Sequence, residues 1–513
     1  MNETQIIGLE QQTAAQRKEK VKTWLKDNHN LVLLGILVFS AIILSYYFSI
    51  TRFQTLWWDE AEYMSTAKKW AFGTYYEILP QRPPLFPFLA FLLYKVGFSE
   101  IPIKFLLEII PTFLSVLFFY FLIKEMYDKK TALIASFILS VSWIHLFYSM
   151  RFMTDSISFL FGIIAFFFFW KGYVLNKGRG YVWLIGPLVA LSFLSRLTGI
   201  LYGMFIFLFL ILTDRFKFLK NKHVWLSLLL FALTISPYLL WSHSYYGNAF
   251  AFRSGYGDVQ GYPLGWNFIS LVYDYPELGF FIFFILGLLT LIPMFLGVDI
   301  LLLKRDKTHY ADFFMFLSML FTLAFFIYFL RVGENRWLIL MSIGIFAVSA
   351  KGIVLIYSFV NKNVSKILAI ILLLAILFSG AYFQLKHADA IIKSKINSYY
   401  QVKEAALWMK SNSNSSDIII SASLPQTIYY SERKVILFLN PKVINQAYTQ
   451  EEFTELIKKL RPKFFVTSVF EPWVPQWTYN YTQQYPEQFK PVKAWFADAE
   501  QKQPILIIYE FTP

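Results

Sequence analysis

The sequence predicts a polytopic α-helical membrane protein with a C-terminal soluble α/β domain. Of its 513 residues, 57% are hydrophobic and only 16% are charged, whereas soluble proteins carry about 25% charged residues. Apolar runs recur up to residue 385, and about 20 helical residues span the roughly 30 Å hydrocarbon core of a bilayer. Backbone polar groups in hydrocarbon must pair within the protein, so these runs are expected to be helices.

About 11 membrane crossings are predicted, and two regions decide this number. The apolar stretch 181–213 lies between two basic segments, so it is expected to form two short helices that turn at Ser195-Arg196-Leu197-Thr198-Gly199. The stretch 83–97 is short and contains Lys95, so it is interpreted as an outer-face or re-entrant helix. The predicted crossings are 31–50, 103–123, 131–149, 154–170, 181–195, 198–213, 224–241, 279–303, 311–330, 336–357 and 367–385.

The net charge of +14 reflects basic residues that gather mostly in loops predicted on one side of the membrane. Twenty Lys and Arg residues fall in the N-terminal tail and in every second loop, whereas the opposite loops before residue 386 carry ten. Cytoplasmic loops are enriched in Lys and Arg, so the first set is predicted to be cytoplasmic. We therefore expect a multi-pass protein of a prokaryotic plasma membrane, with termini on opposite sides and no nucleic-acid partner.

Composition divides the chain into three parts. Residues 1–30 form a basic cytoplasmic tail, 31–385 a transmembrane domain with a first outer loop at 51–101, and 386–513 an extracytoplasmic α/β domain. Helices and strands alternate in the last part. The chain has no cysteine, which excludes disulfides and thiolate metal sites. Helices are expected at 401–410 and 450–460, and strands at 417–421, 435–439, 464–466 and 505–509.

The first outer loop holds the strongest candidate for chemistry. It opens with Trp57-Trp58-Asp59-Glu60-Ala61-Glu62-Tyr63, and apolar residues then recur at helical spacing. Such a helix is predicted to lie at the membrane interface, with its tryptophans at headgroup level. Asp59 and Glu60 then stand at its start, either for catalysis or as an acidic first turn favoured by the helix dipole. Further along the loop, Arg82 precedes the rigid Pro83-Pro84.

Other charged residues fall in loops predicted on the same side. Ionisable groups at membrane depth are costly and usually functional or paired. Arg151 and Asp155, four residues apart, either take part in a site or merely form an ion pair along a helix. Arg196 has no acidic neighbour in the sequence, so it either binds an anion or extends to lipid headgroups. The remaining group is the segment Arg331-Val332-Gly333-Glu334-Asn335-Arg336-Trp337.

Together these residues resemble the GT-C superfamily of integral membrane glycosyltransferases, within the branch of protein O-mannosyltransferases and aminoarabinose transferases. The resemblance covers roughly residues 31–385, and the region after Ala405 resembles the soluble domain that often follows such membrane parts. The residues that carry it are Asp59-Glu60, Arg82-Pro83-Pro84, Arg151 with Asp155, Ser195–Gly199, Ser236-Pro237 with Tyr246-Gly247-Asn248, and Arg336-Trp337-Leu338.

The resemblance implies transfer of a single sugar from a dolichyl or undecaprenyl phosphate to an acceptor hydroxyl of a glycan, lipid or protein at the outer face. This chemistry needs a carboxylate to accept the hydroxyl proton and cations to hold the leaving phosphate. The implied catalytic residues are Asp59 as the base, Glu60 and Asp155. The implied phosphate-binding residues are Arg82, Arg196, Arg336 and Trp337, with Arg151, Arg331, Glu334 and Tyr63 as further candidates.

Two departures from the family pattern narrow the expected substrate. Glu62 stands where some aminoarabinose transferases have an arginine, which weakens that assignment. Oligosaccharyltransferases carry Trp-Trp-Asp in their C-terminal domain, where this chain has only Glu471-Pro472-Trp473, so block transfer of an oligosaccharide to asparagine is disfavoured. No cofactor is expected. Asp59, Glu60 and Asp155 could offer oxygen ligands to a divalent metal, but the closer relatives generally work without one.

Two other functions fit the same residues. A polyprenyl-phosphate transporter or flippase would use the outer arginines for the lipid headgroup, but it would need no particular carboxylate and form no product. A cell-wall polymerase or ligase of related shape is the other alternative.

Overall fold

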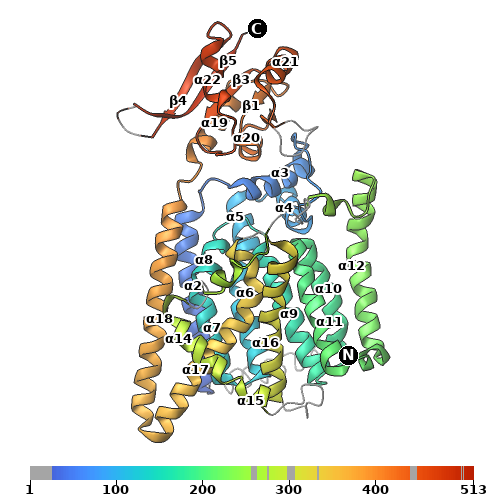
Figure 1. The fold of residues 1–513 in the computed structure, drawn as a ribbon, viewed down its shortest axis with the longest axis vertical. Coiled ribbons are helices and arrows are strands. Elements are labelled where there is room, and N and C mark those ends of the chain that lie inside the picture. The colour runs from blue at the N-terminus through green and yellow to red at the C-terminus, as the bar shows by residue number, and fades with distance from the viewer. Residues whose placement is uncertain are drawn as a thin grey trace, which may run out of the picture. The chain divides into compact units, whose positions relative to one another are not determined.

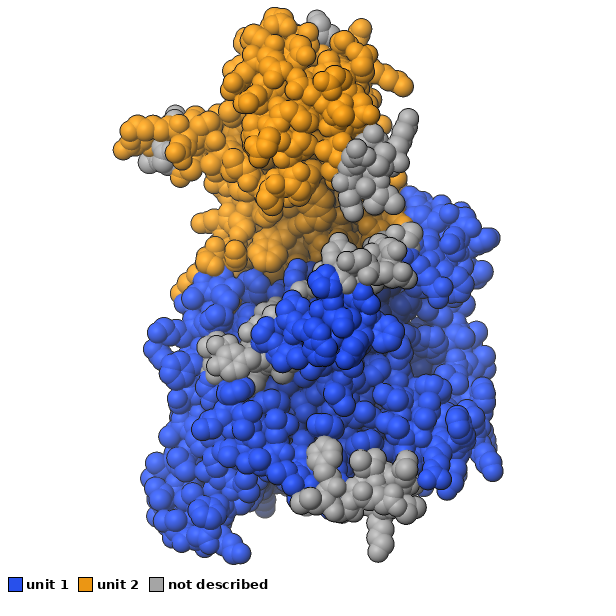
Figure 2. All heavy atoms as spheres, viewed as in Figure 1, with its two compact units in different colours: residues 1–49, 108–150, 154–391 blue, residues 50–107, 151–153, 392–513 orange. Residues whose placement is uncertain are grey.

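The computed structural model describes residues 26–255, 263–273, 277–296, 307–331, 334–439, 447–497, 500 and 502–512. The fold is mostly helical, with one sheet near the C-terminus (Figure 1). The chain forms two compact units, coloured in Figure 2. Residues 1–49, 108–150 and 154–391 make the first, here called the helical unit, and residues 50–107, 151–153 and 392–513 make the second, the α/β unit. The compact units therefore group the first outer loop with the C-terminal residues, whereas composition assigned it to the transmembrane domain.

The predicted membrane class is confirmed by the helices. The described residues contain eight helices long and apolar enough to cross a membrane, or nine if a pair bent by 51° is one span. That pair is α7 (Lys129–Val141) with α8 (Trp143–Ser149). Two more predicted crossings coincide with shorter apolar helices, and the end of the predicted span 279–303 lies outside the described residues. By length and composition alone, the helices of the described residues therefore do not reach the eleven membrane crossings that the sequence predicts.

The long helices are α2 (Asn28–Thr51), α5 (Glu100–Lys104) continued by η1 (Phe105–Ile109) and α6 (Ile110–Met126), α9 (Asp155–Phe168) continued by η2 (Phe169–Val174), η3 (Leu197–Gly199) with α11 (Ile200–Asp214), α12 (Lys222–Tyr246), α16 (Lys307–Phe325) continued by η7 (Phe326–Leu330), α17 (Ile339–Asn363) and α18 (Lys366–Lys395). The shorter elements of the helical unit are α10 (Gly180–Ser195), η4 (Lys217–Lys220), η5 (Ala251–Gly255), α13 (Phe268–Tyr273), α14 (Glu277–Leu289), α15 (Ile292–Leu296) and η8 (Asn335–Leu338).

The predicted turn within 181–213 is confirmed. Helix α10 ends at Ser195, Arg196 is extended (φ −148°, ψ 128°), and one 3₁₀ turn leads into α11. A Cβ added at Gly199 would lie 2.3 Å from the carbonyl oxygen of Ser192, so this close approach requires glycine. The turn is thus fixed by tight packing, and it holds the backbone of Arg196 outside either helix.

The α/β unit contains a five-stranded sheet with the order β2-β1-β3-β5-β4. Strand β1 pairs in parallel with both β2 and β3, whereas β5 is antiparallel to β3 and β4. Its apolar core includes Ile420, Phe453, Phe465 and Tyr481. Besides α5, the elements of this unit are α3 (Trp58–Phe72), α4 (Leu85–Lys95), α19 (Tyr400–Ser411), β1 (Ile418–Ile420), α20 (Leu424–Ser431), β2 (Lys434–Ile436), α21 (Gln450–Leu460), β3 (Phe464–Ser468), α22 (Trp477–Gln484), β4 (Phe489–Phe496) and β5 (Pro504–Phe511).

The C-terminal elements expected from the sequence are all present, although β2 covers only the start of the predicted strand 435–439. Helices α20 and α22 and strand β4 were not predicted. Strand β4 contains Pro491 between two lysines, and a proline is tolerated in a sheet mainly at an edge, which is where β4 lies. Its alternation is too weak to indicate a strand from sequence alone.

Candidate functional site

Helix α3 begins at Trp58, so Asp59 and Glu60 lie at its start, as the sequence predicts. The carboxylate of Glu60 accepts the backbone N–H of Trp57 (2.7 Å), which satisfies a donor that the first helical turn leaves unpaired. Asp59 and Glu60 occupy this first turn, and the helix ends at Gly73 in a left-handed conformation (φ 74°). Most residues of α3 are buried, including all those from Glu60 to Ala67. Helix α3 packs against α4 and α20, while its predicted place at the membrane interface stays a prediction.

Arg82 is shared by two carboxylates of α3. Its Nη2 lies 2.7 Å from Oδ1 of Asp59, and its Nε donates to Oε2 of Glu62. The indole N–H of Trp58 donates to the other oxygen of Glu62 (2.9 Å). The guanidinium also lies 5.6 Å from the ring of Tyr63, so this candidate residue borders the same cluster. We call Asp59, Glu62 and Arg82 the loop cluster.

Glu60 belongs to a second, buried set of contacts. It accepts the backbone N–H of Phe152 (3.0 Å), and one of its oxygens lies 3.6 Å from Nη1 of Arg151. The Arg151 guanidinium stacks over the ring of Trp57 at 3.6 Å and donates to the carbonyl of Thr55 (3.2 Å). The alternative in which Arg151 merely pairs with Asp155 along a helix is therefore wrong. Glu60 and Arg151 instead join the loop before α3 to residues 151–153.

The three acidic side chains at the start of α3 differ in accessibility. The side chains of Glu60 and Glu62 are 1% and 5% exposed, whereas that of Asp59 is 25% exposed. A group that exchanges a proton with a substrate must come within hydrogen-bond reach of it. Asp59 is thus the carboxylate of this segment that a substrate can approach, while Glu60 caps the helix. Glu62, which the sequence did not mark as a site residue, supports Arg82.

Glu62 makes the stability of this segment depend on pH. Burial raises the pKa of Glu62 to about 6, and the charge of Asp59 adds to the increase while Arg82 opposes it. Between pH 4.5 and 6 the folded state then binds more protons than the unfolded state, so stability falls as pH rises through this window. We expect a loss of up to about 2 kcal/mol across it.

Thermal unfolding of the purified protein between pH 4 and 7 measures this effect. In Glu62→Gln the fall should be absent, whereas Glu77→Gln, which removes an exposed carboxylate from the same loop, should retain it. A wild-type protein and a Glu62→Gln variant with parallel pH curves would contradict the prediction.

A second charged cluster lies in the helical unit. Asp155, at the first position of α9, is buried, and its Oδ1 lies 2.6 Å from Nη1 of Arg196. Its other oxygen lies 3.9 Å from Nη1 of Arg336, whose Nε pairs with Glu334 (2.9 Å). Arg196 has no acidic neighbour in the sequence, and the turn after α10 brings it to Asp155. We call Asp155, Arg196 and Arg336 the membrane cluster.

Aromatic rings border the membrane cluster. The Arg196 guanidinium lies 6.0 Å from the ring of Trp337, and that of Arg336 lies 5.7 Å from the ring of Tyr148. Arg331 takes a left-handed conformation (φ 59°) after η7, and its Nε donates to the carbonyl of Tyr328 (3.2 Å). Two of the three predicted phosphate-binding arginines therefore converge on one carboxylate, while Arg82 belongs to the loop cluster.

The described residues contain no group of three or more His, Asp or Glu side chains that could hold a metal ion. Asp59 and Glu60 are paired with Arg82 and Arg151, and Asp155 with Arg196. The expected independence of metal remains a prediction.

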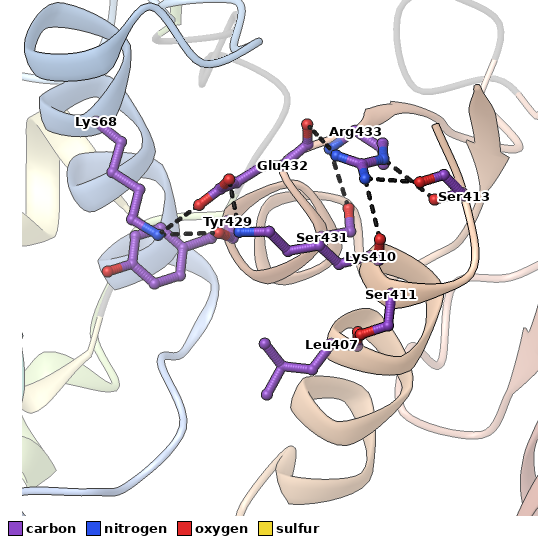
Figure 3. Close-up of polar contacts among 9 residues, drawn as sticks. All are labelled: Lys68, Leu407, Lys410, Ser411, Ser413, Tyr429, Ser431, Glu432 and Arg433. Atoms are coloured by element: carbon purple, nitrogen blue, oxygen red, sulfur yellow. Dashed lines mark hydrogen bonds and ion pairs between the residues drawn. The ribbon is translucent and has the colours of Figure 1, made fainter. Parts of the chain in front are cut away.

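The C-terminal part of the α/β unit supports helix α3 through α20 (Figure 3). Lys68 of α3 donates to the carbonyl of Tyr429 (3.3 Å), lies 3.9 Å from the ring of that tyrosine, and pairs with Glu432 at 3.4 Å. Glu432 also pairs with Lys410 of α19 (2.6 Å). Arg433 donates to the carbonyls of Lys410 and Ser413, which ties the end of α20 to the end of α19 (Figure 3).

Two adjacent tyrosines of α20 reach the first-loop segment. The Tyr430 hydroxyl accepts the backbone N–H of Leu56 (3.1 Å), just before α3. The Tyr429 hydroxyl donates to Glu100 (2.6 Å) and lies 3.0 Å from that of Tyr94. Sequence reasoning missed these residues, because Tyr-Tyr alone carries no signal of a partner more than 300 residues away. Helix α20 is therefore a structural support of the loop that carries Asp59.

Replacing Tyr430 by Phe should destabilise the protein by about 1–3 kcal/mol, because the buried N–H of Leu56 loses its acceptor. The measurement is the midpoint of thermal unfolding in detergent, with Tyr400→Phe, at a tyrosine that is 49% exposed, as the control. Equal unfolding midpoints for the two variants would show that the Tyr430 hydroxyl does not contribute to the stability of the protein.

Several solved structures share the fold of this chain. The oligosaccharyltransferase of Archaeoglobus fulgidus matches with a TM-score of 0.62 and 15% identity, over 87% of this chain and 70% of that one. ArnT from Cupriavidus metallidurans, bound to undecaprenyl phosphate, matches with a TM-score of 0.63 and 13% identity, over 94% of this chain and 98% of that one. At these identities the likeness shows the fold, which is that of the GT-C membrane glycosyltransferases.

The family comparison agrees with the fold. Residues 81–241 match the family described as dolichyl-phosphate-mannose-protein mannosyltransferase, a segment that includes Arg82, Asp155 and Arg196. No curated protein sequence matches the chain significantly. The predicted resemblance to the GT-C superfamily is therefore confirmed for the fold, and the family match covers residues 81–241.

Proposed function

We propose that this protein is a glycosyltransferase that moves a single sugar from a polyprenyl-phosphate donor to an acceptor hydroxyl. The observation that carries the proposal is the loop cluster, in which Asp59 is partly exposed, begins a helix and is held beside Arg82. A partly exposed carboxylate in such a place can come within hydrogen-bond reach of an acceptor hydroxyl and accept its proton. A transporter has no need for such a group.

The reaction assigns a role to each cluster. The acceptor oxygen attacks the anomeric carbon while its proton passes to Asp59, and the bond between that carbon and the phosphate oxygen breaks. The polyprenyl phosphate leaves with the bonding electrons, so its growing negative charge must be stabilised by cations. Arg82, Arg196, Arg336 and the Trp337 indole N–H are proposed to supply this stabilisation, with Asp155 holding Arg196 and Arg336 in place.

The donor class is supported by what the similar proteins bind. ArnT from Cupriavidus metallidurans was solved with undecaprenyl phosphate, and AglB from Archaeoglobus fulgidus with an inhibitory peptide and a dolichol-phosphate; the latter matches with a TM-score of 0.58 and 13% identity, over 95% of this chain and 75% of that one. We extend a polyprenyl-phosphate donor to this chain, with a glycan, lipid or protein acceptor. The site is proposed to open on the extracytoplasmic side of a prokaryotic plasma membrane, following the distribution of Lys and Arg.

The test is to incubate the purified protein with radiolabelled polyprenyl-phosphate hexoses and pentoses and to follow release of polyprenyl phosphate by chromatography. Donor cleavage that is lost in Asp59→Asn and kept in Glu77→Gln supports the proposal. Movement of intact donor across liposomes without cleavage would instead favour the flippase alternative and overturn it.

A further inference from the structure

An apolar groove with a basic end lies in the helical unit, and none of its lining residues belongs to the loop cluster or the membrane cluster. It has a volume of about 350 Å³ and is lined by residues of α10, α11 and α12, by η2 and by η4. The few polar groups of its lining are already used, since the Ser227 hydroxyl accepts the N–H of Gly186 (2.8 Å) and the Tyr173 hydroxyl donates to Asp214 (2.6 Å). The surface that the groove offers to a ligand is therefore almost entirely apolar.

The groove is open on the outside of the helix bundle. Phe207, Met204 and Leu228, which line it, are 53%, 45% and 51% exposed. These side chains belong to two helices that qualify as membrane spans by length and composition, α11 and α12. In a bilayer such a surface faces lipid chains rather than water.

Cations gather where the groove ends. Phe218 and Leu219 of η4 line the groove, and Lys217 and Lys220 flank these two residues directly. Arg215 and Lys222 stand next to them, all four cations are exposed, and none forms an ion pair within the part of the chain that the structure describes. The acidic residue that precedes them in the sequence, Asp214, is buried and accepts a hydrogen bond from the Tyr173 hydroxyl.

We propose that this groove binds one anionic diacyl phospholipid, with its acyl chains along α10, α11 and α12 and its headgroup on Lys217 and Lys220. Basic pockets beside apolar surface between helices are suited to anionic lipid headgroups. The groove fits a lipid rather than the N-terminal tail, because that tail is itself rich in Lys and Arg. The site is independent of the proposed function and lies in the loop predicted to be cytoplasmic.

The sugar donor is a different ligand at a different place. Arg196 precedes the short η3 turn that leads into the start of α11, whereas η4 comes after the end of α11. Fifteen helical residues rise about 22 Å, so a phosphate on the lysines of η4 is separated from one on Arg196 by about that distance.

The experiment is native mass spectrometry of the full chain in detergent, titrated with phosphatidylglycerol and, separately, with phosphatidylcholine. We expect one phosphatidylglycerol to bind more tightly than phosphatidylcholine. Each lysine near a lipid headgroup contributes about five-fold in affinity, so Lys217→Ala/Lys220→Ala should weaken phosphatidylglycerol binding on the order of 20-fold. Met204→Trp, which fills the groove, should weaken both lipids.

The matched control is Lys362→Ala/Lys366→Ala, which removes two exposed cations from another loop predicted on the same side. It should leave binding unchanged. Equal affinity for the two phospholipids, an equal loss in the control, or unchanged binding in Met204→Trp would overturn the proposal. So would recovery of polyprenyl phosphate, identified by its mass, as the lipid that the groove variants lose. None of these readouts depends on sugar transfer.

Discussion

Replacing Asp59 by Asn is expected to lower sugar transfer by about 10²–10⁴-fold, the usual contribution of a general base. The amide keeps the size of the side chain but cannot accept the hydroxyl proton. The fold should persist, because Arg82 keeps its pairing with Glu62 and the cap of α3 is made by Glu60 rather than Asp59. Donor binding should likewise persist, since the variant removes a negative charge and no cation.

Single-turnover transfer and equilibrium binding of a labelled donor separate these effects. Glu77→Gln controls for loss of a carboxylate in the same loop. Glu60→Gln should be milder in turnover and should instead lower the thermal midpoint, because Glu60 is buried against Arg151. If Asp59→Asn turned over at a near-normal rate, Asp155 would become the better candidate for the base.

Loss of Arg196 should weaken donor binding by tens-fold or more, since removing one partner of a buried charged contact typically costs about 2–5 kcal/mol. Arg196→Ala alone is ambiguous, because it also leaves the buried carboxylate of Asp155 with only the more distant Arg336. The double variant Arg196→Ala/Asp155→Asn removes this unpaired charge. If Arg196 binds the phosphate, the double variant should regain thermal stability and still bind donor weakly.

The measurements are a four-member double-mutant cycle in donor affinity and in thermal midpoint. Full recovery of donor affinity in the double variant would mean that Arg196 serves only to neutralise Asp155. Arg253→Ala, at an exposed cation of the same unit, controls for a general loss of positive charge.

The sequence predicts elements well where periodicity and length decide the outcome. The crossings follow from apolar runs, and the break at Arg196 follows from the basic segments on both sides of 181–213. Strand β4 was missed because Pro491 and two lysines mask its alternation, and α20 because its eight residues are too short for a clear period.

The sequence predicted which charged residues form the candidate site, but it predicted few of the ion pairs between them. Asp155, Arg196 and Arg336 were singled out as charged groups at membrane depth, and Asp59 and Arg82 by their positions in the first outer loop. Their partners depend on tertiary contacts, since Arg82 meets carboxylates 20 and 23 residues away. Glu62 was seen only as a departure from a family pattern, because burial is what makes it a support for Arg82.

The support of the first loop by α20 also has a consequence for the order of folding. Leu56 is bonded to a residue 374 positions later in the chain. A ribosome adds about 5–20 residues per second, so the segment that carries Asp59 waits on the order of tens of seconds for its last partner to be synthesised. During translation this loop is therefore exposed to chaperones and proteases, and a nascent chain that stops before α20 never completes it.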